Sequence, residues 1–188
     1  MKNISKFAIL GFLLILTSCV PSLNPLYTDG DLIFDAALLG VWTDTEAAES
    51  WAFTYSDEKE YKLVYTDENG KKGDFKAHLL KIEGKTFLDL TPVKPALAQN
   101  DFYKQNFLVT HTFVQITQAA PNAQVAYLEP DWLKSFLDKN PSAIRHEKLS
   151  GEILLTASTK DLQKFLLAHL NTPGAFSKPI GIKRKAQN

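Results

Sequence analysis

The stretch Trp51-Ala52-Phe53-Thr54-Tyr55 and, after a short polar break, the stretch Tyr61-Lys62-Leu63-Val64-Tyr65 carry large apolar side chains at every second position. Successive side chains of a β-strand point to opposite faces, so a period of two predicts strands with one buried face. Turn residues separate these and later runs at Asn69-Gly70, Gly84-Lys85 and Ser150-Gly151. The sequence therefore predicts a mainly β fold, an antiparallel meander of about eight strands.

Two segments have helical spacing instead. Pro130, which is favoured in the first turn of a helix, begins one of them, and Ser158 begins the other with a capping pattern. Each helix is too short to persist alone in water, so both are expected to dock on the sheet through their apolar faces. These faces consist of Trp132, Leu133, Phe136 and Leu137 in the first helix and of Leu162, Phe165, Leu166 and Leu170 in the second.

The N-terminus has the layout of a secretory signal, because Lys2 and Lys6 flank the start of the unbroken apolar run Phe7–Leu16. This run is well short of the roughly 20 residues that cross a membrane, so a cleaved signal is expected. The tetrad Leu16-Thr17-Ser18-Cys19 then resembles the lipobox of bacterial lipoproteins, whose cysteine is acylated and becomes the first mature residue. Lipidation would also account for Cys19 as the only cysteine of an exported chain.

The lipobox resemblance implies a lipid-anchored protein of the cell envelope, held to the membrane by several acyl chains on Cys19. Val20 follows the cysteine where Asp often marks inner-membrane retention, which favours the outer membrane in a cell with two membranes. We expect a signal peptide at residues 1–18, a tether at 19–30, one β domain at 31–172 and a C-terminal tail at 173–188.

The charge of the mature chain argues against a nucleic-acid partner. Removal of residues 1–18 takes away Lys2 and Lys6, so the 21 basic residues become 19 against 21 acidic ones, and the net charge is −2. A nucleic-acid-binding domain has clustered Lys and Arg on one face. The only basic cluster here, Lys183-Arg184-Lys185, lies in the expected tail.

Further motifs look like those of an uncharacterised group of bacterial lipoproteins whose domain is similar to lipocalins. This resemblance implies that Gly40 and Trp42 start the first strand and that Trp42 closes one end of a barrel. An arginine from the last strands would pack over the indole ring, and Arg145 is the candidate; otherwise Trp42 is an ordinary core aromatic. The motifs are Leu23-Asn24-Pro25-Leu26-Tyr27, Leu39-Gly40-Val41-Trp42, Phe87-Leu88-Asp89-Leu90 and Leu155-Thr156-Ala157-Ser158-Thr159.

The expected helix at residues 130–139 interrupts the strands where a lipocalin would continue them. The alternative fold is therefore α+β, with a curled open antiparallel sheet packed on helices.

No catalytic motif is present, so an enzyme is not expected. The string from His146 to Ser150 begins like a zinc protease motif, but Ser150 stands where the second histidine is required. The other histidines are scattered singly, and neither a metal nor another cofactor is expected. The nucleophile-elbow, P-loop and dinucleotide-binding motifs are absent from the sequence.

One run gives a candidate ligand cavity. Phe107, Val109, His111 and Phe113 share a face of an expected strand at 107–117. If that face points into the barrel, His111 is a polar contact in a mainly apolar pocket; if the barrel is filled, His111 is a satisfied core histidine. The other candidate lining residues are Tyr61, Tyr65, Phe53, Leu63 and Phe75.

Two functions therefore remain open. The first is a lipoprotein that binds a small apolar or amphipathic ligand in its barrel. The second is a non-catalytic structural or interaction protein with a filled barrel that docks an unknown envelope protein. The barrel interior distinguishes the two functions, because it is hollow in the first and filled in the second.

Overall fold

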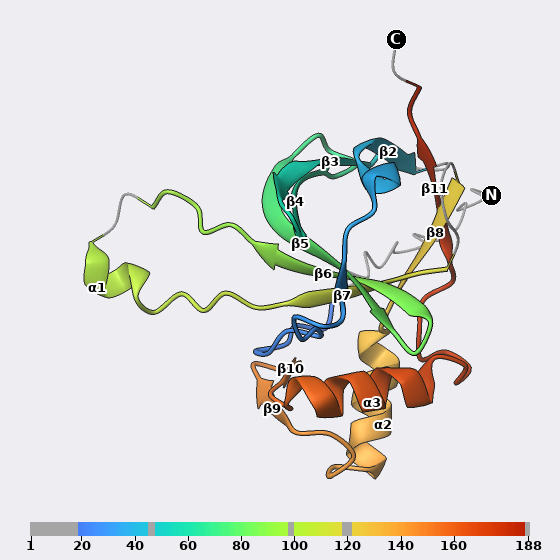
Figure 1. The fold of residues 1–188 in the computed structure, drawn as a ribbon. Helices are drawn as coiled ribbons and strands as arrows, with labels where there is room; N and C mark the ends of the chain where they lie inside the picture. The colour runs from blue at the N-terminus through green and yellow to red at the C-terminus, as the bar shows by residue number, and fades with distance from the viewer. Residues whose placement is uncertain (1–18, 45–47, 98–99, 118–121, 187–188) are drawn as a thin grey trace, which may run out of the picture.

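The computed structural model describes residues 19–44, 48–97, 100–117 and 122–186. Within these residues, nine strands form one sheet in the order β1-β5-β4-β3-β2-β11-β8-β7-β6, and the pairing of β5 with β6 closes eight of them into an antiparallel barrel (Figure 1). The strands are β1 (Leu32–Ile33), β2 (Gly40–Asp44), β3 (Ser50–Asp57), β4 (Glu60–Thr66), β5 (Lys72–Ile82), β6 (Lys85–Pro92), β7 (Thr112–Ile116), β8 (Asn122–Tyr127) and β11 (Ile180–Arg184). The expected mainly β fold with an eight-stranded barrel is confirmed, and the open-sheet alternative is wrong.

Alternate side chains of the barrel strands face the interior, as the period of two predicts. Trp51 and Phe53 of β3 pack with Leu63 of β4, and all three are buried. Glu83 and Gly84 have φ of 47° and 78°, the positive values that a two-residue turn of type I′ requires between antiparallel strands. The predicted turns at Asn69-Gly70 and Ser150-Gly151 join paired strands, whereas the turn expected at Gly84-Lys85 lies one residue earlier, because Lys85 begins β6 and pairs with Ile82.

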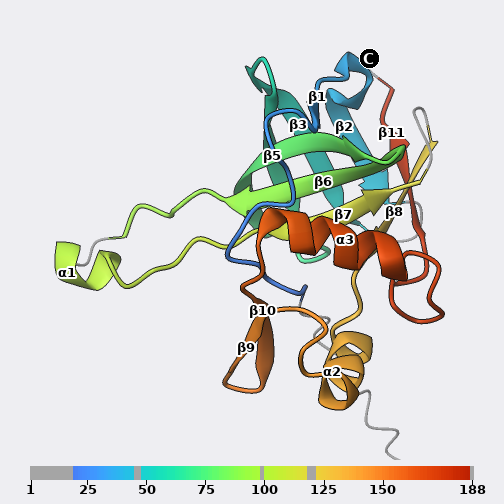
Figure 2. The ribbon, with the colours of Figure 1, turned by 60° about the horizontal axis from the view of Figure 1, so that its bottom comes forward.

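A second layer lies against the outside of the barrel (Figure 2). It consists of the helices α2 (Pro130–Lys139) and α3 (Thr159–His169) and of a hairpin formed by β9 (His146–Leu149) and β10 (Glu152–Leu155). The Ser158 side chain caps α3 by accepting a hydrogen bond from the backbone N–H of Asp161. Both helices dock as expected, in a second core that includes Leu80, Phe87, Phe113, Leu133, Leu137, Leu162 and Leu166.

The segment at residues 19–31 packs on the domain, so the expectation of a free tether at 19–30 is wrong. The backbone of Ser22 pairs with that of His111, and the N–H of Leu26 donates to the Asp89 carboxylate. Cys19 therefore lies directly on the domain surface. Three side chains of the segment are buried: Val20, Ser22 and Leu26.

The expected tail at residues 173–188 contains a barrel strand. β11 pairs with β2 on one side and with β8 on the other, and Ile182 is buried in the interior. Lys183 and Arg184 belong to this strand. A domain boundary at residue 172 would remove the strand that closes the barrel, so that expected boundary is wrong.

The described parts of the connection between β6 and β7, residues 93–97 and 100–111, project from the barrel as a long arm (Figure 1). The short helix α1 (Asp101–Lys104) lies at its tip. The strand expected from Phe107 begins only at Thr112, because residues 107–110 lie in the arm, outside the sheet.

Candidate functional site

The barrel interior is hollow at both ends. We call the two hollows the anchor-end cavity, about 380 Å³, and the far-end cavity, about 390 Å³. Trp51 is in the described lining of both. Cys19 lines the anchor-end cavity together with Leu90 and Thr112, which lie on either side of the β6–β7 arm in the sequence.

The wall of the anchor-end cavity is mostly apolar and aromatic. It is built from inward-facing residues of six strands: Trp51, Leu63, Phe75, Leu90, Tyr127 and Ile180. Tyr65 and Thr112 add hydroxyl groups, and Glu49 and Glu129 add carboxylates. A mainly apolar pocket with a few polar groups is the usual form of a site for a small ligand.

The two phenols of the anchor-end cavity are neutral hydrogen-bonding groups. Burial raises the pKa of Tyr65 far above its usual range, and the negative charge of Glu49 and a hydrogen bond to it act in the same direction. Burial likewise raises the pKa of Tyr127. The described lining includes the carboxylates of Glu49 and Glu129 but no Lys, Arg or His, so this cavity is electrostatically unfavourable for an anionic head group.

The far end of the barrel is closed by the short helix η1 (Ala36–Leu38) and by Trp42. The indole Nε1 of Trp42 donates to the Leu38 carbonyl at 2.8 Å. Arg184 of β11 is the cross-strand partner of Trp42, and its Nε lies 3.0 Å from where a Cβ on Gly40 would be. Gly40 also has a φ of 120°, which an L side chain rarely adopts.

The interpretation of Arg145 as the arginine over Trp42 is wrong. Arg145 is an exposed residue between α2 and β9, where its carbonyl accepts from the Thr156 N–H. Arg184 occupies the position beside Gly40 and Trp42 instead. Arg184 is not among the residues predicted from the sequence, because it lies in the expected tail at residues 173–188.

His111 lies outside the barrel, contrary to the hypothesis that it faces the interior. Neighbouring side chains alternate, and Val114 belongs to the interior whereas Phe113 belongs to the second core. His111 Nδ1 donates to Oδ1 of the fully buried Asp89 at 2.7 Å, and Asp89 Oδ2 accepts from Leu26 N–H at 2.8 Å. His111 is thus a satisfied histidine that helps to hold the N-terminal segment.

The remaining candidate residues divide between three places. Tyr61 is fully buried inside the barrel, where its hydroxyl donates to the Asp35 carbonyl and accepts from the Asp35 N–H. Phe113 packs under the helices, and Phe107 is exposed on the arm. Of the candidate lining residues, Leu63, Tyr65 and Phe75 are in the described lining of the anchor-end cavity, and Phe53 is in that of the far-end cavity.

His78 lies on the same outer face as Asp89 and His111. Its ring is 4.6 Å from that of Tyr27, and its Nδ1 is buried without a hydrogen bond among the described residues. Burial lowers the pKa of His78, and the charge of Glu60 partly offsets this. The neutral imidazole thus fits beneath the N-terminal segment as a packing residue.

A further hollow lies outside the barrel, between α3 and residues 141–146, with a volume of about 630 Å³. Its cationic side chains Arg145 and Lys164 are exposed to solvent. A ligand in this open groove would therefore remain more exposed to water than a ligand in either cavity inside the barrel.

Comparison of the chain with protein-family models, with curated proteins and with solved structures gave no match. Within the described residues, no group of three or more His, Cys, Asp or Glu side chains is placed to hold a metal ion. No helix in this part of the chain is both long and apolar enough to cross a membrane.

Proposed function

We propose that the protein is a lipoprotein of the bacterial cell envelope, anchored through acylated Cys19, that binds an apolar or amphipathic molecule in its anchor-end cavity. The observation that carries this proposal is a mainly apolar cavity inside the barrel that has Cys19 itself in its lining. Its volume of about 380 Å³ falls within the range of small-molecule sites, roughly 300–1,000 Å³.

The packing of the N-terminal segment supports a role beside the membrane. Val20, next to Cys19, is buried, so an acylated Cys19 would hold the anchor-end cavity close to the bilayer. An apolar molecule could then pass between the membrane and the barrel with little exposure to water, which lowers the hydrophobic cost of the transfer.

The charges around the cavity favour a ligand with a neutral or cationic head group. Glu49 and Glu129 line the cavity, and an anionic head group beside them would be repelled. A monoacylglycerol, an alcohol or an amine with one alkyl chain fits this lining better than a free fatty acid.

The proposal is tested by fluorescence titration of a soluble chain, residues 19–188 with Cys19→Ser. We expect saturable binding of one NBD-labelled monoacylglycerol per chain, and several-fold weaker binding of an NBD-labelled fatty acid of equal length. Added salt should narrow this difference in affinity, because salt partly screens the repulsion from the half-buried carboxylates of Glu49 and Glu129. If neither probe binds saturably, the alternative of a non-catalytic structural or interaction protein of the envelope replaces the proposal.

A further inference from the structure

The arm at residues 93–111 carries an unusual share of the exposed apolar surface. Of the ten large apolar side chains that are exposed in the described part of the chain, five lie in the arm. Leu108 and Phe102 are 73% and 80% exposed. Such a concentration of exposed apolar groups marks an interaction surface. The five residues are Val93, Phe102, Tyr103, Phe107 and Leu108.

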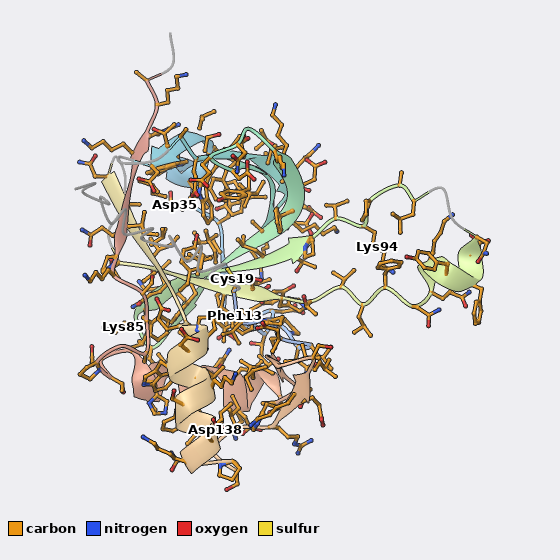
Figure 3. All side chains as sticks on the ribbon, turned by 180° about the vertical axis from the view of Figure 1, so that it is seen from behind. Cys19, Asp35, Lys85, Lys94, Phe113 and Asp138 are labelled. Atoms are coloured by element: carbon orange, nitrogen blue, oxygen red, sulfur yellow. The ribbon has the colours of Figure 1, made fainter. Side chains whose placement is uncertain are left out.

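The arm leaves the barrel at the end where Cys19 lies. Leu90 of β6 precedes the arm and Thr112 of β7 follows it, and both line the anchor-end cavity together with Cys19. Figure 3 shows Lys94 on the projecting arm.

The base of the arm is fixed to the anchor position by hydrogen bonds. The N–H of Ser22 donates to the carbonyl of His111 at 2.9 Å, and the N–H of His111 donates back at 2.8 Å. Ser22 is three residues after Cys19, and three extended residues span at most about 11 Å. The base of the arm therefore lies within about 11 Å of Cys19, the residue to which the lipid would be attached.

The side chains of the arm suit a membrane interface. Aromatic rings and leucine supply apolar contacts at the level of the lipid head groups, and lysine favours the acidic lipids of bacterial membranes. Lys104 forms an ion pair with Asp101 at 3.4 Å. Lys94 is the remaining charged residue of the arm, so the arm has a net positive charge, whereas the mature chain has a net negative one.

We infer that the arm is a second membrane contact, in which Phe102, Phe107 and Leu108 insert into the lipid interface beside the acylated Cys19. This inference rests on the anchoring part of the proposed function. It does not require that the barrel binds a ligand.

The test places an environment-sensitive label on the arm of the full lipidated protein. Because Cys19 is the only cysteine, the acylated chain has no free thiol, and Leu108→Cys can be labelled alone with NBD. Tyr55→Cys is the matched control: Tyr55 is 60% exposed on β3, and its ring contacts that of Phe34, whose neighbours Ile33 and Asp35 line the far-end cavity. Both proteins are placed in vesicles of phosphatidylethanolamine and phosphatidylglycerol that contain doxyl-labelled lipid.

We expect the label at position 108 to shift to shorter emission wavelengths and to be quenched by the doxyl lipid, with neither change at position 55. A label at position 108 that emits as in water on vesicle-bound protein would overturn the inference and leave the cavity proposal intact. A shift at 108 that needs no lipid and rises with protein concentration would assign the arm to a second copy of the chain. If fatty-acid labelling does not mark the wild type more than Cys19→Ser, both the anchor and the arm contact are wrong.

Discussion

A chain that ends at residue 172 should lose cooperative unfolding altogether, whereas one that ends at residue 186 should retain it. Truncation at 172 removes β11, which pairs with both β2 and β8. Two strands of the closed barrel would then have unpaired edges, and the buried side chain of Ile182 would leave the interior. The barrel would open along its length, so the truncation should remove most of the free energy of unfolding.

This truncation is measured in the background of residues 19–188 with Cys19→Ser, by near-ultraviolet circular dichroism and thermal melting. The chain that ends at 186 is the matched control, because it retains β11. A sharp melting transition in the shorter chain would mean that β11 is dispensable and that the barrel is stable as an open sheet.

The substitution Trp42→Ala should lower the free energy of unfolding by about 3–5 kcal/mol. Trp42 is 1% exposed, and its indole N–H donates to the Leu38 carbonyl, which fixes η1 across the barrel end. Truncation to Ala removes the buried ring, leaves a cavity and leaves that carbonyl without its donor. The stability loss is read from urea denaturation.

Trp132→Ala serves as the comparison for Trp42→Ala. Trp132 is only partly buried, at the edge of the second core, where it stacks on Phe136. Its loss should therefore cost clearly less than that of Trp42. A cost below about 1 kcal/mol for Trp42→Ala is the size typical of surface substitutions and would contradict the burial of this ring at the barrel end.

The sequence predicts the barrel strands well where one face is apolar and the other polar. Trp51, Phe53 and Leu63 alternate with more polar neighbours, so the period of two indicates the inward face correctly. On β6, by contrast, Phe87 packs in the second core while Leu88 packs inside the barrel. A strand that is buried on both faces has no alternation from which to assign them, and the face of His111 was wrongly assigned for the same reason.

The N-terminal segment and β11 could not be predicted because their stabilising partners are far away in sequence. Leu26 is buried in irregular backbone, and its polar contacts come from Asp89 and Gln163. The strand β11 is short, with Ile182 as its single buried side chain. Such segments have too few apolar residues to form a periodic pattern.

The measurement that tests the central claim most directly compares Thr112→Phe with Thr86→Phe in the probe titration. Both threonines are partly buried on neighbouring strands, but Thr112 lines the anchor-end cavity and Thr86 the far-end cavity. A ring at position 112 should overlap with the ligand and make the binding free energy about 1–3 kcal/mol less favourable. The Kd of the monoacylglycerol probe should therefore rise at least about fivefold. We expect Thr86→Phe to leave the Kd of the probe unchanged. Equal weakening by both substitutions, or no weakening by Thr112→Phe in a chain with an unaltered melting temperature, would contradict a ligand site beside Cys19.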